Sequence, residues 1–208
     1  LERLERWLDK AGAVFWSAYF LSYGGTFPRP YEGQTVRTFR ELARRGVAGM
    51  KSEVTPGRYD RWRSAEFFMY LVARAMYDTD LDPESLRADF CRRYYGAAAP
   101  HCEAYLRMNS LCVERYAGEL KDVDATTLPD LYTDTEVQAL LAHMDRARDM
   151  AEREGGSAPR RVAPLLAQAR EIADSRREVV LSRAEAAPLQ ARRLLHPPAF
   201  GDFDRLDW

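Results

Sequence analysis

The chain has 208 residues, of which 46% are hydrophobic and 30% charged, a composition typical of soluble globular proteins with one or two domains. Its formal net charge of −1 excludes a general electrostatic attraction to nucleic acid or to an anionic membrane surface. No apolar run approaches the roughly 20 residues of a membrane-spanning helix, so we expect neither nucleic acid nor a membrane as a partner.

Residues 1–80 alternate between helical and strand-like patterns. Apolar residues recur at helical spacing in 1–11, and the short aromatic and β-branched run 13–20 is typical of a buried strand. Beyond a loop rich in Gly and Pro, the patterns predict a helix over 35–45, a second strand over 47–54 and a long apolar helix over 62–76.

This order is that of βα units, in which helices connect parallel strands. A parallel sheet is buried on both faces, so two strands need further strands beside them. We therefore expect residues 1–80 to be the last two βα units of a (β/α) barrel, and the chain to be the C-terminal part of a larger protein. The first residue, Leu1, opens directly into a helical pattern, which agrees with a missing N-terminus.

From Asp82 onward the patterns are helical throughout. Asp82 is a good N-cap, and Pro83 suits the first position of a helix. We expect an α-helical domain over 81–195, followed by an irregular tail over 196–208. The expected helices run to Tyr95, from Pro100 to about Leu120, over 135–154 and over 160–185, with a polar linker at 122–134.

The spacing of cysteine and histidine provides no metal site and no disulfide framework. Three cysteines are too few for such a framework, and they are typical of small buried hydrophobes. The three histidines lie far apart in the sequence. We expect no metal and no cofactor, and the cellular compartment stays open. These residues are Cys91, Cys102, Cys112, His101, His143 and His196.

Short motifs between Tyr19 and Leu106 resemble one bacterial family. They are Phe27-Pro28-Arg29-Pro30, Arg45-Gly46-Val47-Ala48-Gly49, the helix core from Phe68 to Met76, and Asp89-Phe90 followed by Tyr95-Gly96-Ala97-Ala98. This stretch resembles the domain of unknown function 4838 family, which is related to the barrels of α-glucuronidases and β-hexosaminidases. The resemblance implies a carbohydrate-active, glycoside-hydrolase-like (β/α) barrel that hydrolyses or binds glycosides, with sugars containing uronic acid or N-acetylhexosamine as candidates.

Alternation along the second predicted strand selects a catalytic candidate. Val47, Gly49, Lys51 and Glu53 share one face, which changes from apolar to charged toward the carboxyl end of the strand, where barrel enzymes carry their active sites. Glu53 is therefore predicted to be an acid/base carboxylate or a sugar ligand, with Lys51 beside it. The alternative is a surface ion pair between Lys51 and Glu53. Glycoside hydrolysis needs two carboxylates, and no second one is assigned.

Aromatic residues near the end of the first strand are candidates for sugar binding, because flat rings suit the apolar faces of pyranoses. Trp16, Tyr19 and Tyr23 are predicted to contact the carbohydrate, although they equally suit packing of the barrel top, Trp16 above all. Arg58, after the second strand, is a candidate for binding a uronic acid carboxylate. The alternative for Arg58 is a solvated surface residue.

A second function remains open from the sequence alone. The charged helices of the C-terminal part also suit a non-enzymatic module for protein interaction or structural support, and they allow a homodimer. Whether the barrel hydrolyses glycosides or only binds them is likewise left open.

Overall fold

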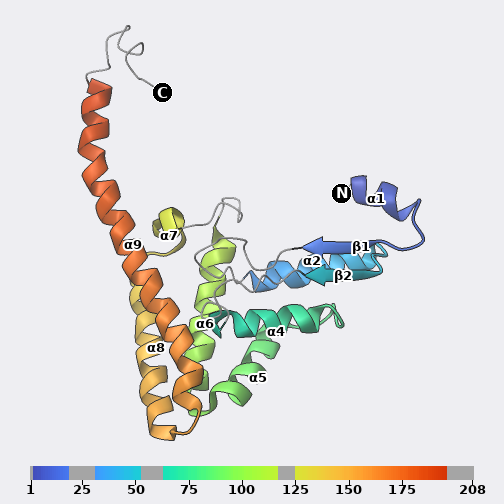
Figure 1. Cartoon of the computed structure of the whole chain (residues 1–208), viewed down its shortest axis with the longest axis horizontal. Helices are drawn as coiled ribbons and strands as arrows, with labels where there is room; N and C mark the ends of the chain where they lie inside the picture. Colours follow the sequence, from blue (N-terminus) through green and yellow to red (C-terminus); the bar gives the residue numbers. More distant parts are fainter. Residues whose placement is uncertain (1, 19–30, 53–62, 117–124, 196–208) are drawn as a thin grey trace.

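The protein is mostly helical, with a small sheet at one end (Figure 1). The structure, a computed structural model, describes residues 2–18, 31–52, 63–116 and 125–195. In chain order the elements are α1 (Glu2–Leu8), β1 (Phe15–Ala18), α2 (Glu32–Arg44), β2 (Gly49–Ser52), α4 (Glu66–Ala75), α5 (Pro83–Tyr95), α6 (Ala99–Arg115), α7 (Leu128–Leu131), α8 (Asp134–Glu154) and α9 (Ala158–Leu195). Short 3-10 turns at Arg63–Ala65, Gly96–Ala98 and Ala125–Thr127 complete them.

The two strands are neighbours and run parallel, as the sequence predicts. Phe15 pairs with Gly49, and Trp16 pairs with Met50. A Cβ on Gly49 would lie 2.8 Å from the Phe15 ring, so Phe15 and Gly49 share one face of the sheet. Trp16 and Met50 share the other face, where Met50 packs against the hydrophobic core.

Helix α2 follows β1 in the chain, helix α4 follows β2, and the two helices pack against each other. In α2 the apolar residues Val36, Phe39 and Leu42 recur at three- and four-residue spacing and are buried. In α4 the buried residues come from a nearly continuous apolar run, because this helix contacts α2 and α5. Burial of these faces, rather than intrinsic helix propensity, supplies most of their stability.

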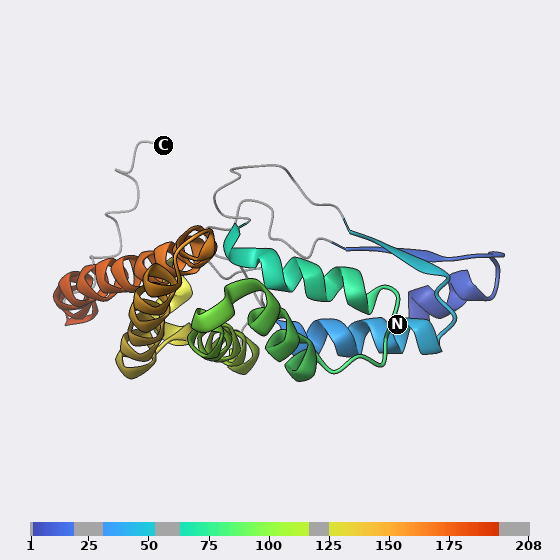
Figure 2. The ribbon, with the colours of Figure 1, turned by 90° about the horizontal axis from the view of Figure 1, so that it is seen from below.

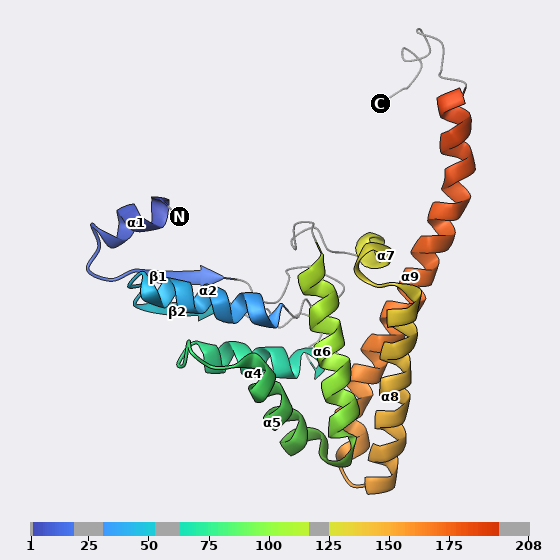
Figure 3. The same cartoon turned by 180° about the vertical axis from the view of Figure 1, so that it is seen from behind.

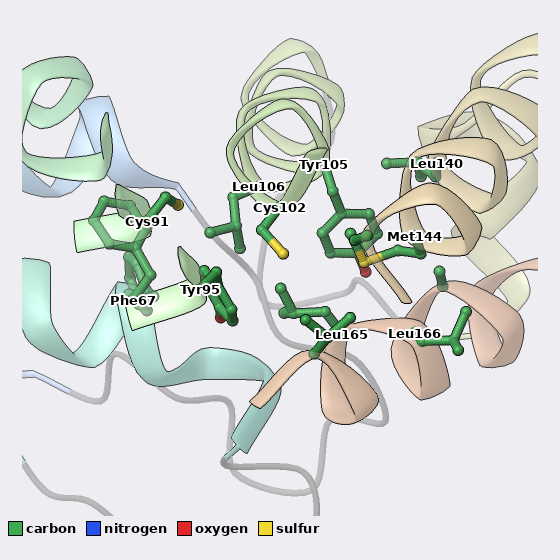
Figure 4. Close-up of a cluster of buried hydrophobic side chains, with 14 of the residues drawn as sticks. Phe67, Cys91, Tyr95, Cys102, Tyr105, Leu106, Leu140, Met144, Leu165 and Leu166 are labelled. Carbon is green, nitrogen blue, oxygen red and sulfur yellow. The ribbon is translucent and has the colours of Figure 1, made fainter. Parts of the chain in front are cut away.

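The C-terminal part consists of α6, α8 and α9, which lie side by side (Figures 1 and 3). One hydrophobic cluster runs from Val36 in α2 to Ile172 in α9. Figure 4 shows its centre, where Tyr95 and Cys102 of the α5–α6 region face Leu165 of α9 and Met144 of α8. The hydrophobic cluster includes residues on both sides of position 80. The division there between a barrel part and a helical domain stays a prediction.

Several expected helices differ from the structure in their bounds, and one helix was not expected. The predicted polar linker contains α7, whose Leu128 and Leu131 are buried against α9. Helix α6 ends at Arg115 rather than near Leu120. Helix α9 continues to Leu195, ten residues past the expected end, in spite of Pro188 within it. The tail over 196–208 lies outside the described residues.

In the described part of the chain, no helix combines the length and the apolar character needed to cross a membrane.

Candidate functional site

The carboxyl ends of β1 and β2 lie next to each other. Ser17 pairs with Lys51, and Ala18 pairs with Ser52, the last residue of each strand. The two strands therefore end at neighbouring points, at the same end of the sheet. Lys51 is exposed, on the face that it shares with Phe15 and Gly49.

Four of the six predicted site residues lie outside the described residues. In the sequence, Tyr19 and Glu53 come directly after the paired strand ends at Ala18 and Ser52, and Tyr23 and Arg58 follow a few residues later. The roles of these residues stay predictions.

The structure separates the other two predicted site residues. Trp16 is 37% exposed and lies on the face of the sheet opposite to Lys51. It lines an apolar groove of about 650 Å³ together with Leu4 and Trp7 of α1 and Leu42 of α2. Trp16 and Lys51 therefore do not line one common surface of the two-stranded sheet.

A polar cluster lies where α2 meets α5 and α6. Glu32, in the first turn of α2, forms an ion pair with Arg87 of α5, and the exposed fractions of these residues are 2% and 1%. Arg87 also contacts Glu84, which lies 3.6 Å from Arg107. Sequence reasoning did not identify this pair, because both residues resemble ordinary solvated helix charges.

The electrostatics of this pair follow from its burial. Burial raises the pKa of Glu32 to about 8, against the opposing effect of the neighbouring Arg87 guanidinium. Burial alone lowers the pKa of Arg87, but the carboxylates of Glu32 and Glu84 outweigh it and raise the pKa above its usual value. The guanidinium therefore stays charged, and the Glu32 carboxyl group takes up a proton at a higher pH than an exposed glutamate does.

The pair is closed off from solvent. A polar cavity of about 210 Å³ is lined by both residues of the pair and by Arg37, Arg107 and Glu114. However, Oε1 of Glu32 and Nε of Arg87 are buried and lack a hydrogen-bond partner among the described residues. We regard the cluster as a structural joint between α2 and α5.

The start of α2 is held by three helices at once. Tyr31 packs edge-on against Phe68 of α4, with ring centroids 5.4 Å apart. The backbone N–H of Gly33 donates to Oε1 of Glu114 on α6 at 2.6 Å. Together with the Glu32–Arg87 pair, these contacts fix the first turn of α2 against the helical part.

The remaining polar groups do not form a metal centre in the part of the chain that the structure describes. His101 of α6 and His143 of α8 approach each other with 3.4 Å between their Nδ1 atoms. Burial, helped by His101, lowers the pKa of His143. Burial raises the pKa of Cys102 to about 12 and that of Cys112 to about 11, so these thiols stay protonated and unreactive at neutral pH.

The described residues thus define a mostly helical protein that carries a parallel βα pair at one end, and four of the six predicted site residues come after the ends of its strands in the sequence. The chain belongs to the family described as a domain of unknown function, DUF4838. The model of this family matches residues 2–107, which is half of the chain. The match reaches from α1 to α6, so it joins the sheet and α5 in one family region. Comparisons with curated proteins and with solved structures found no match.

Proposed function

We propose that this chain is the C-terminal part of a carbohydrate-active, glycoside-hydrolase-like protein in which β1 and β2 are the last strands of a (β/α) barrel. The observation that supports this proposal is the parallel pairing of Ser17 with Lys51 and of Ala18 with Ser52. In (β/α) barrels the reacting groups are carried by the segments that follow the carboxyl ends of the strands. Both segments with predicted sugar-binding residues begin at such an end.

The open state of the small sheet also supports the barrel. Phe15, 69% exposed, lies on the sheet face that the helices do not cover, and both edges of the sheet are open among the described residues. A parallel sheet with an uncovered face and unpaired edges is incomplete, because its backbone groups and apolar side chains need partners. Further βα units of a larger protein are partners of the required kind.

In this proposal Glu53 is the carboxylate that exchanges a proton with the glycosidic oxygen or binds a sugar hydroxyl. Lys51, two residues earlier, contributes positive charge on the same strand face. Tyr19, Tyr23 and Arg58 contribute ring and guanidinium contacts to the sugar, the last to a uronic acid carboxylate. The second carboxylate that hydrolysis requires belongs to the remainder of the barrel.

Activity measurements on the longer protein test this proposal. We expect turnover of at least one member of a panel of aryl glycosides and glucuronides, and a loss of at least about 100-fold in kcat for Glu53→Gln. Glu178→Gln, on the exposed side of α9, is the matched control and should retain full activity. An absence of turnover together with an absence of sugar binding by calorimetry would contradict the proposal.

One observation favours the alternative, a helical interaction module. Val180 and Leu181 of α9 are 40% and 57% exposed, next to each other on the outer part of that helix. If they mediate a homodimer, sedimentation should show a dimer that Leu181→Glu converts to a monomer. A monomer at all concentrations would exclude a homodimer through α9.

A further inference from the structure

The apolar groove beside β1 is bounded by three elements. Leu4 and Trp7 come from α1, Trp16 from β1, and Leu42 from α2, and the groove has a volume of about 650 Å³. Trp7 is 59% exposed, although it lies beside buried apolar residues. Glu5 of α1 forms an ion pair with Arg45 at the end of α2. The groove therefore lies between α1, α2 and β1, which are held together beside it.

The position of α1 shows which edge of the sheet is incomplete on this side. Figure 2 shows α1 and α2 on the same side of the sheet, and Figure 1 shows α1 beyond β1, on the side away from β2. Helix α1 thus extends past the open edge of β1, where the described residues place no strand beneath it.

The handedness of βαβ units then selects the occupant. Nearly all connections from one parallel strand through a helix to the next are right-handed. Because α2 leads from β1 to β2 on this face of the sheet, a helix on the same face that leads into β1 must come from a strand on the opposite side of β1. We propose that the open edge of β1 pairs with a parallel strand that precedes α1 in the same polypeptide, and that outward apolar side chains of this strand fill the groove against Trp7 and Trp16.

This inference rests on the barrel proposed above, but not on the sugar chemistry. The added strand would continue the parallel β1–β2 ladder at the open edge of β1. Every second residue of this strand would face α1 and should be apolar. A second copy of the chain is the competing occupant, since an exposed strand edge is a template for pairing between molecules.

The backbone of β1 provides a direct reporter. Val14 accepts a hydrogen bond from the N–H of Ala48 at 2.8 Å, so its backbone groups point toward β2. Since successive residues of a strand point their backbone groups to alternate sides, Trp16 also points toward β2. Phe15 and Ser17 point toward the open edge.

Amide exchange by NMR tests the inference on two proteins, the 208-residue chain and the longer protein that includes the residues encoded ahead of Leu1. We expect the amides of Phe15 and Ser17 to exchange at least about tenfold more slowly in the longer protein, with the Trp16 amide protected in both as an internal control. Equal exchange of Phe15 and Ser17 in the two proteins would overturn the inference. Protection that appears in the shorter chain as its concentration rises would also overturn it, because a second copy would then be the occupant.

Side-chain variants add an independent measurement. Trp7→Ala should lower the unfolding midpoint of the longer protein by more than that of the shorter chain, because the added strand buries the part of this ring that is exposed in the shorter chain. Tyr77→Ala is the matched control, since Tyr77 is 93% exposed and lies away from the groove. Protected edge amides without turnover or sugar binding would leave this inference standing and defeat the carbohydrate activity. Turnover with unprotected edge amides would defeat this inference and leave the carbohydrate activity standing.

Discussion

Buried charge distinguishes Glu32 and Arg87 from the other charged residues. Most ion pairs of the described residues involve at least one exposed side chain, and such pairs contribute little to stability. Glu32 and Arg87 are both nearly inaccessible and lie 55 residues apart in the sequence. A pair of this kind costs desolvation energy, and its main effect is to fix how α2 meets α5.

The raised pKa of Glu32 predicts a specific pH dependence. Burial raises the pKa from 4.5 to about 8 in the folded protein, so the folded state binds this proton more tightly than the unfolded state. The resulting stability is complete below about pH 4.5 and is lost as the pH rises through about 8. Glu32→Gln should remove this dependence, which amounts to roughly 2–4 kcal/mol between pH 5 and pH 9.

Urea unfolding of both proteins across this pH range measures the effect. Glu84→Gln is the control, because Glu84 belongs to the same cluster but is 56% exposed, and it should keep the pH dependence of the unmodified chain. Parallel pH profiles of Glu32→Gln and the unmodified chain would show that Glu32 does not titrate as described.

Gly96 is required at the turn between α5 and α6. Its φ is +55°, and a Cβ would lie 2.5 Å from Oε1 of Glu154, whose carboxylate accepts from the N–H of Ala97 at 2.7 Å. Gly96→Ala should therefore reduce the free energy of unfolding by about 1–3 kcal/mol. Gly12→Ala, where no atom lies within 4 Å of the new Cβ, should change it by less than about 0.5 kcal/mol. Equal effects in chemical denaturation would contradict this account.

Among the elements, α8 has the most complete local start. The side chain of Thr133 accepts from the N–H of Glu136, and the Glu136 carboxylate accepts from the N–H of Thr133, which together form a capping box. Glu136 also binds Arg115 of α6, and that contact lowers the pKa of Glu136 to about 2. The cap thus connects α8 with α6.

Loss of this cap should be measurable. Thr133→Ala should reduce the free energy of unfolding by about 0.5–2 kcal/mol, because the N–H of Glu136 loses its acceptor. Thr38→Ala, on the exposed side of α2, is the matched control and should be neutral or slightly stabilising, since Ala is the better helix former. Urea denaturation at neutral pH compares the two; a neutral Thr133→Ala would mean that water replaces the cap without cost.

At the scale of the whole molecule, the shared core decides whether the two predicted domains behave separately. Leu165 of α9 is 1% exposed and lies in one cluster with Phe67 of α4 and Met144 of α8 (Figure 4). Leu165→Ala should cost about 2–5 kcal/mol through lost burial and the cavity that remains.

This substitution also tests the division at residue 80. With one cooperative core, amide exchange in α4 and in α8 should accelerate together in Leu165→Ala. Leu181→Ala is the control, because Leu181 is 57% exposed and should change stability by less than about 0.5 kcal/mol. Faster exchange in α8 alone would support independent domains over 1–80 and 81–195.

The elements that local patterns define were predicted correctly. An aromatic and β-branched run predicted the first strand and the segment 47–54 the second, and apolar spacing with Asp82, Pro83 and Gly155 predicted most helices. Helix α7 was missed, because two leucines in a segment rich in Asp and Thr provide too short a pattern. Of the candidate site, the position after adjacent strand ends was predictable, whereas the separation of Trp16 from Lys51 emerged only from the pairing register.

The sequence by itself determined the order and type of most elements and the family, because these depend on neighbours within a few residues and on local motifs. Only the tertiary structure decided which strand face the helices cover, which edge of β1 is open, and that Glu32 is buried against Arg87. These features depend on contacts between residues far apart in the chain. Their energies come from burial and desolvation, which a local pattern does not encode.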